Sequence, residues 1–313
     1  MVVTDHGRAI GTIGGGLLEA RVLENAKAVL SSRVPLLIPF DMAHSDIASM
    51  DMICGGRLDV LLEAIDPGSP AAAVYDAWLK ADREPDPGLL LVALRLSDGE
   101  LKSVTHGVLQ GRQVICGDLD LDPPALEALL RDHAGAACPR TVVCSNWTVL
   151  IEPLLPAETV FVFGAGHVAQ PTARLAKMVG FRVCVVDDRP EFANADRFPG
   201  ADDIRVVAEF DSALEGLEIG RSGYVVILTR GHLHDRTVLM QILRTEAGYI
   251  GMIGSRRKRE QVFRSLREEG FSAADLNRVH SPIGIDIGAE SCEEIAVSIV
   301  AELVHTRARM RGA

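Results

Sequence analysis

The segment Glu158–Asp188, ETVFVFGAGHVAQPTARLAKMVGFRVCVVDD, has the pattern of a strand, a glycine turn, a helix and a second strand. The apolar run 160–163 leads into the turn GAGHVA at 164–169, and a second apolar run, 181–186, ends at Asp187. Such a βαβ unit is typical of a dinucleotide-binding fold, in which the terminal acid binds a ribose hydroxyl. We therefore expect an α/β fold whose C-terminal half is a Rossmann-like, doubly wound parallel sheet.

Each residue type in this turn has a physical role. Gly164 permits the tight turn, Gly166 lets backbone N–H groups approach a pyrophosphate, and the small Ala169 lets the helix pack close to the strand. His167 lies inside the turn, where it can touch a phosphate. The helix N-terminus also presents unpaired N–H donors to an anion. A doubly wound sheet that keeps the turn and binds no nucleotide is the alternative, because fold and site are separable.

Length and composition narrow the class of protein. A chain of 313 residues is expected to form two domains. The formal net charge of -11 argues against a broad nucleic-acid partner, which needs a basic surface. The six cysteines, at 54, 116, 138, 144, 184 and 292, form no C-x-x-C pair, so neither a zinc site nor a disulfide framework is indicated. Reduced thiols, the lack of a signal peptide and the lack of a membrane-spanning run predict a cytoplasmic protein without a membrane partner.

Two glycine-containing segments stand out before the expected domain boundary at 153–156. Gly14, Gly15 and Gly16 precede a run with helical spacing, which makes them a weak second anion site, although a flexible turn is the favoured interpretation. Cys54 lies beside Gly55 and Gly56, whose exposed N–H groups can lower a thiol pKa or let a ligand approach. The alternative for Cys54 is a small buried hydrophobic residue. The stretch 142–155 is predicted to be a single strand.

Two loops follow later strands of the expected Rossmann half. RGHLHD, from Arg230 to Asp235, follows the strand 224–229 and therefore faces the ligand crevice. His232 and His234 are candidates for acid/base chemistry, and we predict no metal site because a third ligand is missing. Asp235 is a further catalytic candidate, and the alternative is that it only caps a helix over 236–246.

The second of these loops carries positive charge. SRRKR begins at Ser255 and Arg256, after the strand 249–254. Cations at a helix start suggest that an anion compensates them, and a solvated basic face is an equal alternative.

Taken together, the motifs resemble the XdhC/CoxI family of accessory proteins that mature xanthine dehydrogenase and related molybdenum hydroxylases. The matching pieces occur in order along nearly the whole chain: GTIGGGLLE, CGG at Cys54, FGAGHVA, TRGHLHD, YIGMIGSRRK and SPIGIDIGAESCEEIAVSIVAEL. The resemblance implies an XdhC/CoxI-type mixed α+β domain over 1–154 and a Rossmann domain over 155–313. Family members usually carry further residues before the position of Met1, which implies a truncated start here, and Cys292 stands where proline is common.

The resemblance also implies a function. It implies binding of molybdenum cofactor (molybdopterin), support of its sulfuration by a cysteine desulfurase, delivery to a molybdenum hydroxylase apo-enzyme, and a homo-oligomeric state. The glycine turns offer sites for the phosphate of a pterin, and the soft sulfur of Cys54 suits molybdenum or sulfur chemistry. We therefore expect a cofactor-binding chaperone rather than a stand-alone enzyme.

Two other functions compete with that expectation. An NAD(P)-dependent oxidoreductase would use Asp187 to select NAD and His167, His232 or His234 as acid or base. No tyrosine–lysine pair typical of dehydrogenases is evident. The other alternative is an interaction module with a vestigial Rossmann domain. For the cofactor, NAD(P) or another nucleotide is the alternative to molybdenum cofactor.

Overall fold

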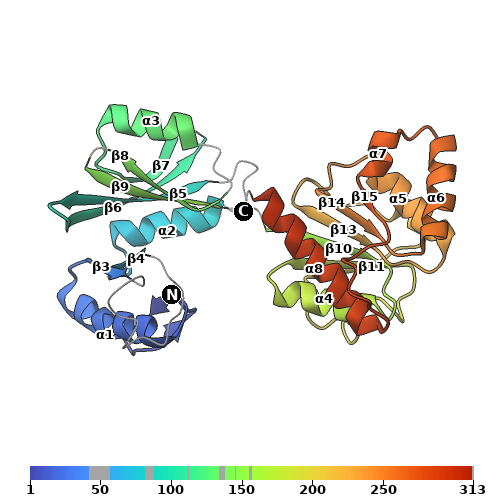
Figure 1. Cartoon of the computed structure of the whole chain (residues 1–313), viewed down its shortest axis with the longest axis horizontal. Coiled ribbons are helices and arrows are strands. Elements are labelled where there is room, and N and C mark those ends of the chain that lie inside the picture. The colour runs from blue at the N-terminus through green and yellow to red at the C-terminus, as the bar shows by residue number, and fades with distance from the viewer. Residues whose placement is uncertain are drawn as a thin grey trace. The chain divides into compact units, whose positions relative to one another are not determined.

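The computed structural model describes residues 1–41, 57–81, 88–111, 113–133, 138–144, 146–154 and 157–311 (Figure 1). The chain forms two compact units, an N-terminal unit, Met1–Leu155, and a C-terminal unit, Pro156–Ala313. Each unit has its own sheet and its own buried clusters of apolar side chains. None of the described helices is long and apolar enough to cross a membrane.

A six-stranded parallel sheet forms the centre of the C-terminal unit. Its strands, in spatial order, are β12 (Asp203–Val206), β11 (Arg182–Asp187), β10 (Thr159–Phe163), β13 (Gly223–Ile227), β14 (Tyr249–Met252) and β15 (Val279–His280). The chain runs from β10 outward to β12 and then returns to β13 on the other side of β10. This is the strand order of the Rossmann fold, and the reversal between β10 and β13 is where such sheets bind ligands. The predicted fold class is confirmed.

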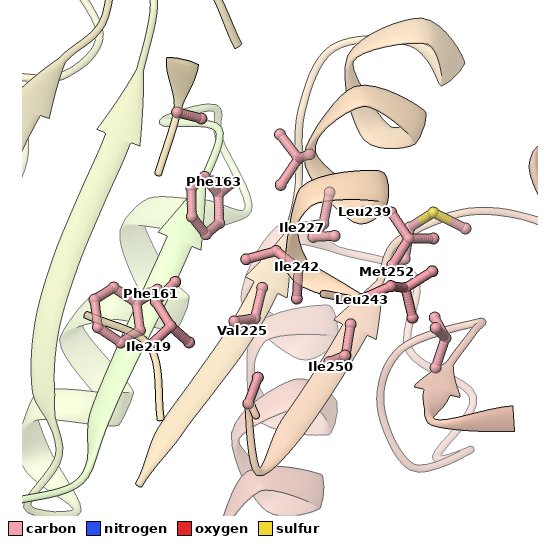
Figure 2. Packing of buried hydrophobic residues seen from close by; sticks show 14 of the residues in the cluster. Phe161, Phe163, Ile219, Val225, Ile227, Leu239, Ile242, Leu243, Ile250 and Met252 are labelled. Atoms are coloured by element: carbon pink, nitrogen blue, oxygen red, sulfur yellow. The ribbon is translucent and has the colours of Figure 1, made fainter. Parts of the chain in front are cut away.

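Helices cover both faces of this sheet, because alternate side chains of each strand point to opposite faces. On one face Val160 and Val162 pack against α4 (Ala169–Met178) and α8 (Cys292–Met310). The other face packs against α5 (His232–Ile242), α6 (Arg256–Glu268), α7 (Ala273–Asn277) and the 3-10 turn Phe210–Ser212. Figure 2 shows Phe161 and Phe163 of β10 near Val225 and Ile227 of β13, with α5 above them. The strands are therefore apolar on both faces, as the runs in the sequence predict.

The N-terminal unit is a mixed α+β structure. It contains the hairpin β1 (Val2–Val3) and β2 (Ala9–Ile10), the helix α1 (Gly16–Ser32), and the antiparallel pair β3 (Leu36–Asp41) and β4 (Arg57–Leu62). A five-stranded antiparallel sheet follows, in the order β7 (Gln113–Asp118), β6 (Glu100–Gln110), β5 (Leu89–Ser97), β9 (Trp147–Pro153) and β8 (Arg140–Cys144). Helix α2 (Pro70–Ala81) packs on one of its faces and α3 (Pro123–His133) on the other.

Two element predictions were wrong. The stretch 142–155 is not one strand, because β8 and β9 form an antiparallel hairpin in which Cys144 pairs with Trp147. Asn146, a residue type that favours turns, lies in a turn directly before β9. Helix α5 begins at His232 rather than Arg236, because Gly231, with φ of 84°, stands at its N-terminal cap position.

Candidate functional site

The glycine turn after β10 touches the backbone that follows β13. Gly164 has φ of 102°, and a Cβ atom there would lie 2.5 Å from the carbonyl oxygen of Leu228 and 2.8 Å from the Cα of Thr229. These neighbours are backbone atoms, which cannot rotate away, so no side chain fits at Gly164. The contact holds the two loops side by side at the point where the strand order reverses.

Gly166 has a different environment from Gly164. A Cβ atom on Gly166 would meet nothing within 4 Å, and Gly166 itself is partly exposed. Helix α4 begins at the buried Ala169, and none of the described side chains caps its N-terminus at Val168. The space over Gly166 and the uncapped N–H groups together fit an anionic group such as a phosphate.

His167 is exposed and lines a cavity of about 970 Å³ within the C-terminal unit. The cavity lies between α4, the segment 196–201 and the start of α8, and Arg174, Arg197 and Cys292 contribute to its wall. Its volume is in the range of small-molecule sites, which run from roughly 300 to 1,000 Å³. His167 therefore belongs both to the glycine turn and to a cavity large enough for a cofactor.

The carboxylate of Asp187 is held by hydrogen bonds within the protein. Its side chain is 1% exposed, and it accepts hydrogen bonds from the Ala165 N–H (2.7 Å), the Arg189 N–H (3.0 Å) and the Arg189 guanidinium (2.8 and 3.0 Å). Burial would raise the pKa of Asp187, but the bonds from Arg189 and Ala165 outweigh it, so the pKa is lowered. Both carboxylate oxygens are engaged inside the protein, so in this conformation Asp187 fixes the glycine turn instead of facing a ribose.

Three residues that the sequence did not single out surround this carboxylate. Arg189 stacks on Phe192, with its guanidinium carbon 3.8 Å from the ring centroid, and Asp188 accepts a hydrogen bond of 2.6 Å from Arg230. The Oδ1 atom of Asp188 is buried and has no hydrogen-bond partner among the described residues. Arg197 donates to the Ala165 carbonyl at 3.3 Å. The predicted candidate Arg230 is thus brought beside the end of β11, and two further arginines lie close to the turn.

A buried ion pair lies on the β13 side of the turn. Asp235 is 0% exposed, accepts a hydrogen bond of 2.5 Å from the Thr229 hydroxyl, and pairs with the ammonium group of Lys258. Burial raises the pKa of Asp235, and the opposing effects of Lys258 and Thr229 do not fully cancel it. Asp235 does not cap α5 as predicted, because it lies in the first turn and points inward to Thr229. Lys258 was missed, although it stands within the basic run that the sequence marked.

The remaining candidate residues of this unit lie at the starts of α5 and α6. His232 is exposed at the first position of α5, whereas the His234 ring lies 5.1 Å from the Phe210 ring. The described residues contain no group of three His, Cys, Asp or Glu side chains that could hold a metal ion. Ser255 caps α6 by accepting the Lys258 N–H at 3.2 Å, and Arg256 is exposed beside it.

The candidate anion site of the N-terminal unit, Gly14 to Gly16, lies beside an acidic side chain. Gly14, Gly15 and Gly16 have φ of 117°, 74° and 63° and lead into α1, as predicted. The carboxylate of Glu19, however, accepts a hydrogen bond of 2.6 Å from Thr12 and one of 3.5 Å from the Ile13 N–H. An acidic side chain thus bonds to the turn at the start of α1, which disfavours a second anion there. Cys54, Gly55 and Gly56 lie outside the described residues.

Two family models match the chain, one at each end. The model of the XdhC Rossmann domain matches residues 160–303, and the model of the XdhC and CoxI family matches residues 1–41. The chain belongs to the XdhC and CoxI family. The match at 160–303 covers the glycine turn, the Asp187 bonds and the Asp235–Lys258 pair, so the site described above lies in the XdhC Rossmann domain.

Curated relatives of this XdhC-family chain match it over nearly its whole length. It is 27% identical over 314 residues to a probable xanthine dehydrogenase subunit of Bacillus subtilis, covering 99% of the chain and 88% of that protein. It is 22% identical to the molybdenum cofactor insertion chaperone PaoD of Escherichia coli, covering 98% of the chain and 77% of PaoD. Against YqeB of Escherichia coli the identity is 25%, and the chain spans 41% of the length of that relative.

A solved structure has the same fold. A crystal structure of a xanthine dehydrogenase from Bacillus halodurans superposes with a TM-score of 0.77 at 25% identity, covering 99% of this chain and 85% of that one. The match extends over both units, so the solved structure resembles the N-terminal α+β unit as well as the Rossmann unit.

Proposed function

We propose that the chain is a maturation factor for molybdenum hydroxylases of the xanthine dehydrogenase type. In this proposal it binds molybdenum cofactor transiently, supports its sulfuration together with a cysteine desulfurase, and delivers it to the apo-enzyme in the cytoplasm. The observation that carries the proposal is the family membership together with a glycine turn whose surroundings suit a phosphate. The names of two relatives, a molybdenum cofactor insertion chaperone and a probable xanthine dehydrogenase subunit, also support a maturation role.

Different residues of the chain would bind different parts of the cofactor. The open space over Gly166, the uncapped start of α4 and the nearby His167 would hold the phosphate of the pterin, or the pyrophosphate of a pterin dinucleotide. The Cys54 thiol would meet the molybdenum or its sulfur ligand, because a soft thiolate suits both. The bound cargo supplies hydroxylation chemistry only in the target enzyme. We therefore propose a chaperone role rather than turnover by this chain.

A direct experiment is anaerobic purification of the full chain, followed by measurement of molybdenum and of released pterin. We expect both to co-purify with the wild-type chain and to be lost from Cys54→Ser. Cys144→Ser, which changes a partly exposed free thiol of β8, is the matched control and should keep them. The proposal fails if the wild-type chain takes up neither molybdenum nor pterin, or if Cys54→Ser retains both in full.

An NAD(P)-dependent oxidoreductase is the second candidate, because the strand order is that of dinucleotide-binding domains. The internal bonds of Asp187 weigh against it, since the acid that would select NAD is engaged by Arg189. Fluorescence titration with NADH, combined with a search for substrate-dependent NADH oxidation, separates the two. Turnover of NADH with a substrate would favour the oxidoreductase, whereas NADH binding without turnover fits a chaperone that uses the nucleotide site for its cargo.

Partners and assembly follow from the same proposal. Co-precipitation of the chain with a cysteine desulfurase and with an apo-hydroxylase tests the two protein partners. Light scattering on the purified chain tests the expected homo-oligomer. If the chain is a monomer and still binds molybdenum cofactor, the expected homo-oligomer is wrong, and the maturation role is unaffected.

A further inference from the structure

The Asp235–Lys258 ion pair lies where a ligand of the Rossmann unit would bind. Asp235 belongs to the first turn of α5, after β13, and Lys258 to the first turn of α6, after β14. Thr229, which donates to Asp235, is also one of the residues against which Gly164 packs. The glycine turn, Thr229, Asp235 and Lys258 are thus in sequential contact at the reversal of strand order, where open α/β sheets bind ligands.

The backbone before α6 is arranged around Lys258. Gly254 has φ of 150°, and a Cβ atom there would lie 2.7 Å from Cδ of Lys258, so glycine leaves the space through which the lysine stem passes. Ser255, the N-terminal cap of α6, accepts the backbone N–H of the same residue. Two consecutive residues therefore position one lysine.

The Asp235–Lys258 pair is not explained by a contribution to folding stability. A buried ion pair contributes little relative to apolar residues of similar volume, because the desolvation of both charges offsets their attraction. Asp235 is fully buried, and the side chain of its partner Lys258 is 23% exposed. A buried carboxyl with a perturbed pKa beside a specific charged partner is a pattern found at functional sites.

The difference in exposure separates the roles of the two residues. Asp235 has no surface that a ligand could touch, so it can act only by holding Lys258 in place. The ammonium group carries three donor protons, and the Lys258 side chain is partly exposed, so donors are left for a ligand. Arg230, in the loop after β13, is a second cation at this edge and is paired with Asp188 at 2.6 Å. An anionic ligand is therefore favoured over a neutral one.

We propose that Lys258 binds the phosphate or pyrophosphate group of the ligand held by the Rossmann unit, and that Asp235 is its positioning residue. This deepens the proposed function, on which it rests for the identity of the natural ligand. The class of ligand is a phosphorylated small molecule, either a nucleotide or a phosphorylated pterin. Lysine is well suited to this role because its ammonium acts as a compact charge on phosphate oxygens.

The test measures binding of ADP, inorganic pyrophosphate and adenosine to the full chain by calorimetry. The double variant Lys258→Met with Asp235→Asn removes the cation without leaving a buried carboxylate unpaired. We expect it to bind ADP and pyrophosphate about tenfold or more weakly than wild type, since a hydrogen bond to a charged group is lost, and to bind adenosine unchanged. Asp235→Asn alone keeps the cation and should lose less affinity than the double variant.

A charge-matched control comes from the other unit. Glu100→Gln with Lys102→Met removes an exposed pair with a separation of 2.6 Å from the β5–β6 hairpin and should leave ADP binding unchanged. Wild-type chain that binds neither ADP nor pyrophosphate would overturn the inference, and so would a Lys258 double variant that binds both as wild type does. Molybdenum and pterin content distinguishes failure of this inference from failure of the proposed function. If wild type and the double variant contain equal amounts of both, the maturation role stands and Lys258 has no part in it.

Discussion

Replacing Gly164 by alanine tests whether the contact between the two loops determines the fold of the C-terminal unit. The alanine would keep a φ of 102°, which costs about 1–2 kcal/mol for a residue with a Cβ atom. Its Cβ would also overlap the Leu228 carbonyl, 2.5 Å away, and the Thr229 Cα, 2.8 Å away. Overpacking of this kind costs about 1–3 kcal/mol. We therefore expect Gly164→Ala to lower the free energy of unfolding by about 2–5 kcal/mol.

Thermal unfolding followed by far-UV circular dichroism measures this change. For units of roughly 150–250 residues, 1 kcal/mol corresponds to about 2–4 °C, so a loss of about 3 kcal/mol lowers the midpoint by about 6–12 °C. Trp78 and Trp147, the two tryptophans of the chain, both lie in the N-terminal unit. Tryptophan fluorescence therefore reports that unit, and the circular dichroism signal is needed to follow the other.

Gly166→Ala is the matched control, because its Cβ would meet nothing within 4 Å. We expect its midpoint to stay within about 2 °C of wild type. The reasoning is refuted if Gly164→Ala melts within that same margin, or if the two alanine variants are destabilised equally. Either result would show that the packing on Leu228 and Thr229 is not what requires glycine at 164.

Two further predictions concern buried carboxylates. Asp187→Ala should lower the free energy of unfolding by about 2–3 kcal/mol in urea titrations, because it leaves the Ala165 N–H and Arg189 without their acceptor, and an unchanged midpoint would contradict the role we assign to Asp187. Glu302 accepts hydrogen bonds from Tyr249 and from the Gly284 N–H and lies 2.8 Å from His280; burial would raise its pKa, but these partners outweigh burial and lower it. The unfolded chain therefore binds more protons, so stability should be lost as pH falls through the lowered pKa, and Glu302→Gln should flatten this part of the stability–pH curve; an unchanged slope would show that Glu302 does not contribute.

Much of the Rossmann unit follows from local sequence patterns. The apolar run 160–163 lies in β10, and the run 181–186 lies in β11 from Arg182 onward. Gly164 permits a turn that no residue with a side chain could adopt. The acidic start and basic end of α8 match the helix dipole, and Ser291 and Glu294 form a capping box. Periodicity, turn residues and caps act over a few positions, so they can be read without knowledge of the fold. The start of α5 was misplaced because Gly231 was not recognised as its cap position.

The sequence by itself determined the βαβ unit, the need for glycine at 164 and the basic character of the segment after β14, because each depends on neighbouring residues. Only the tertiary structure decided which partners the charged groups take. Asp187 faces Ala165 and Arg189 rather than open space, and Asp235 meets Lys258 across two helix starts. These pairs form because parallel strands end at one edge of the sheet, where loops far apart in sequence converge. Local pattern gives the chemistry available at that edge, and packing decides which of those groups remain for a ligand.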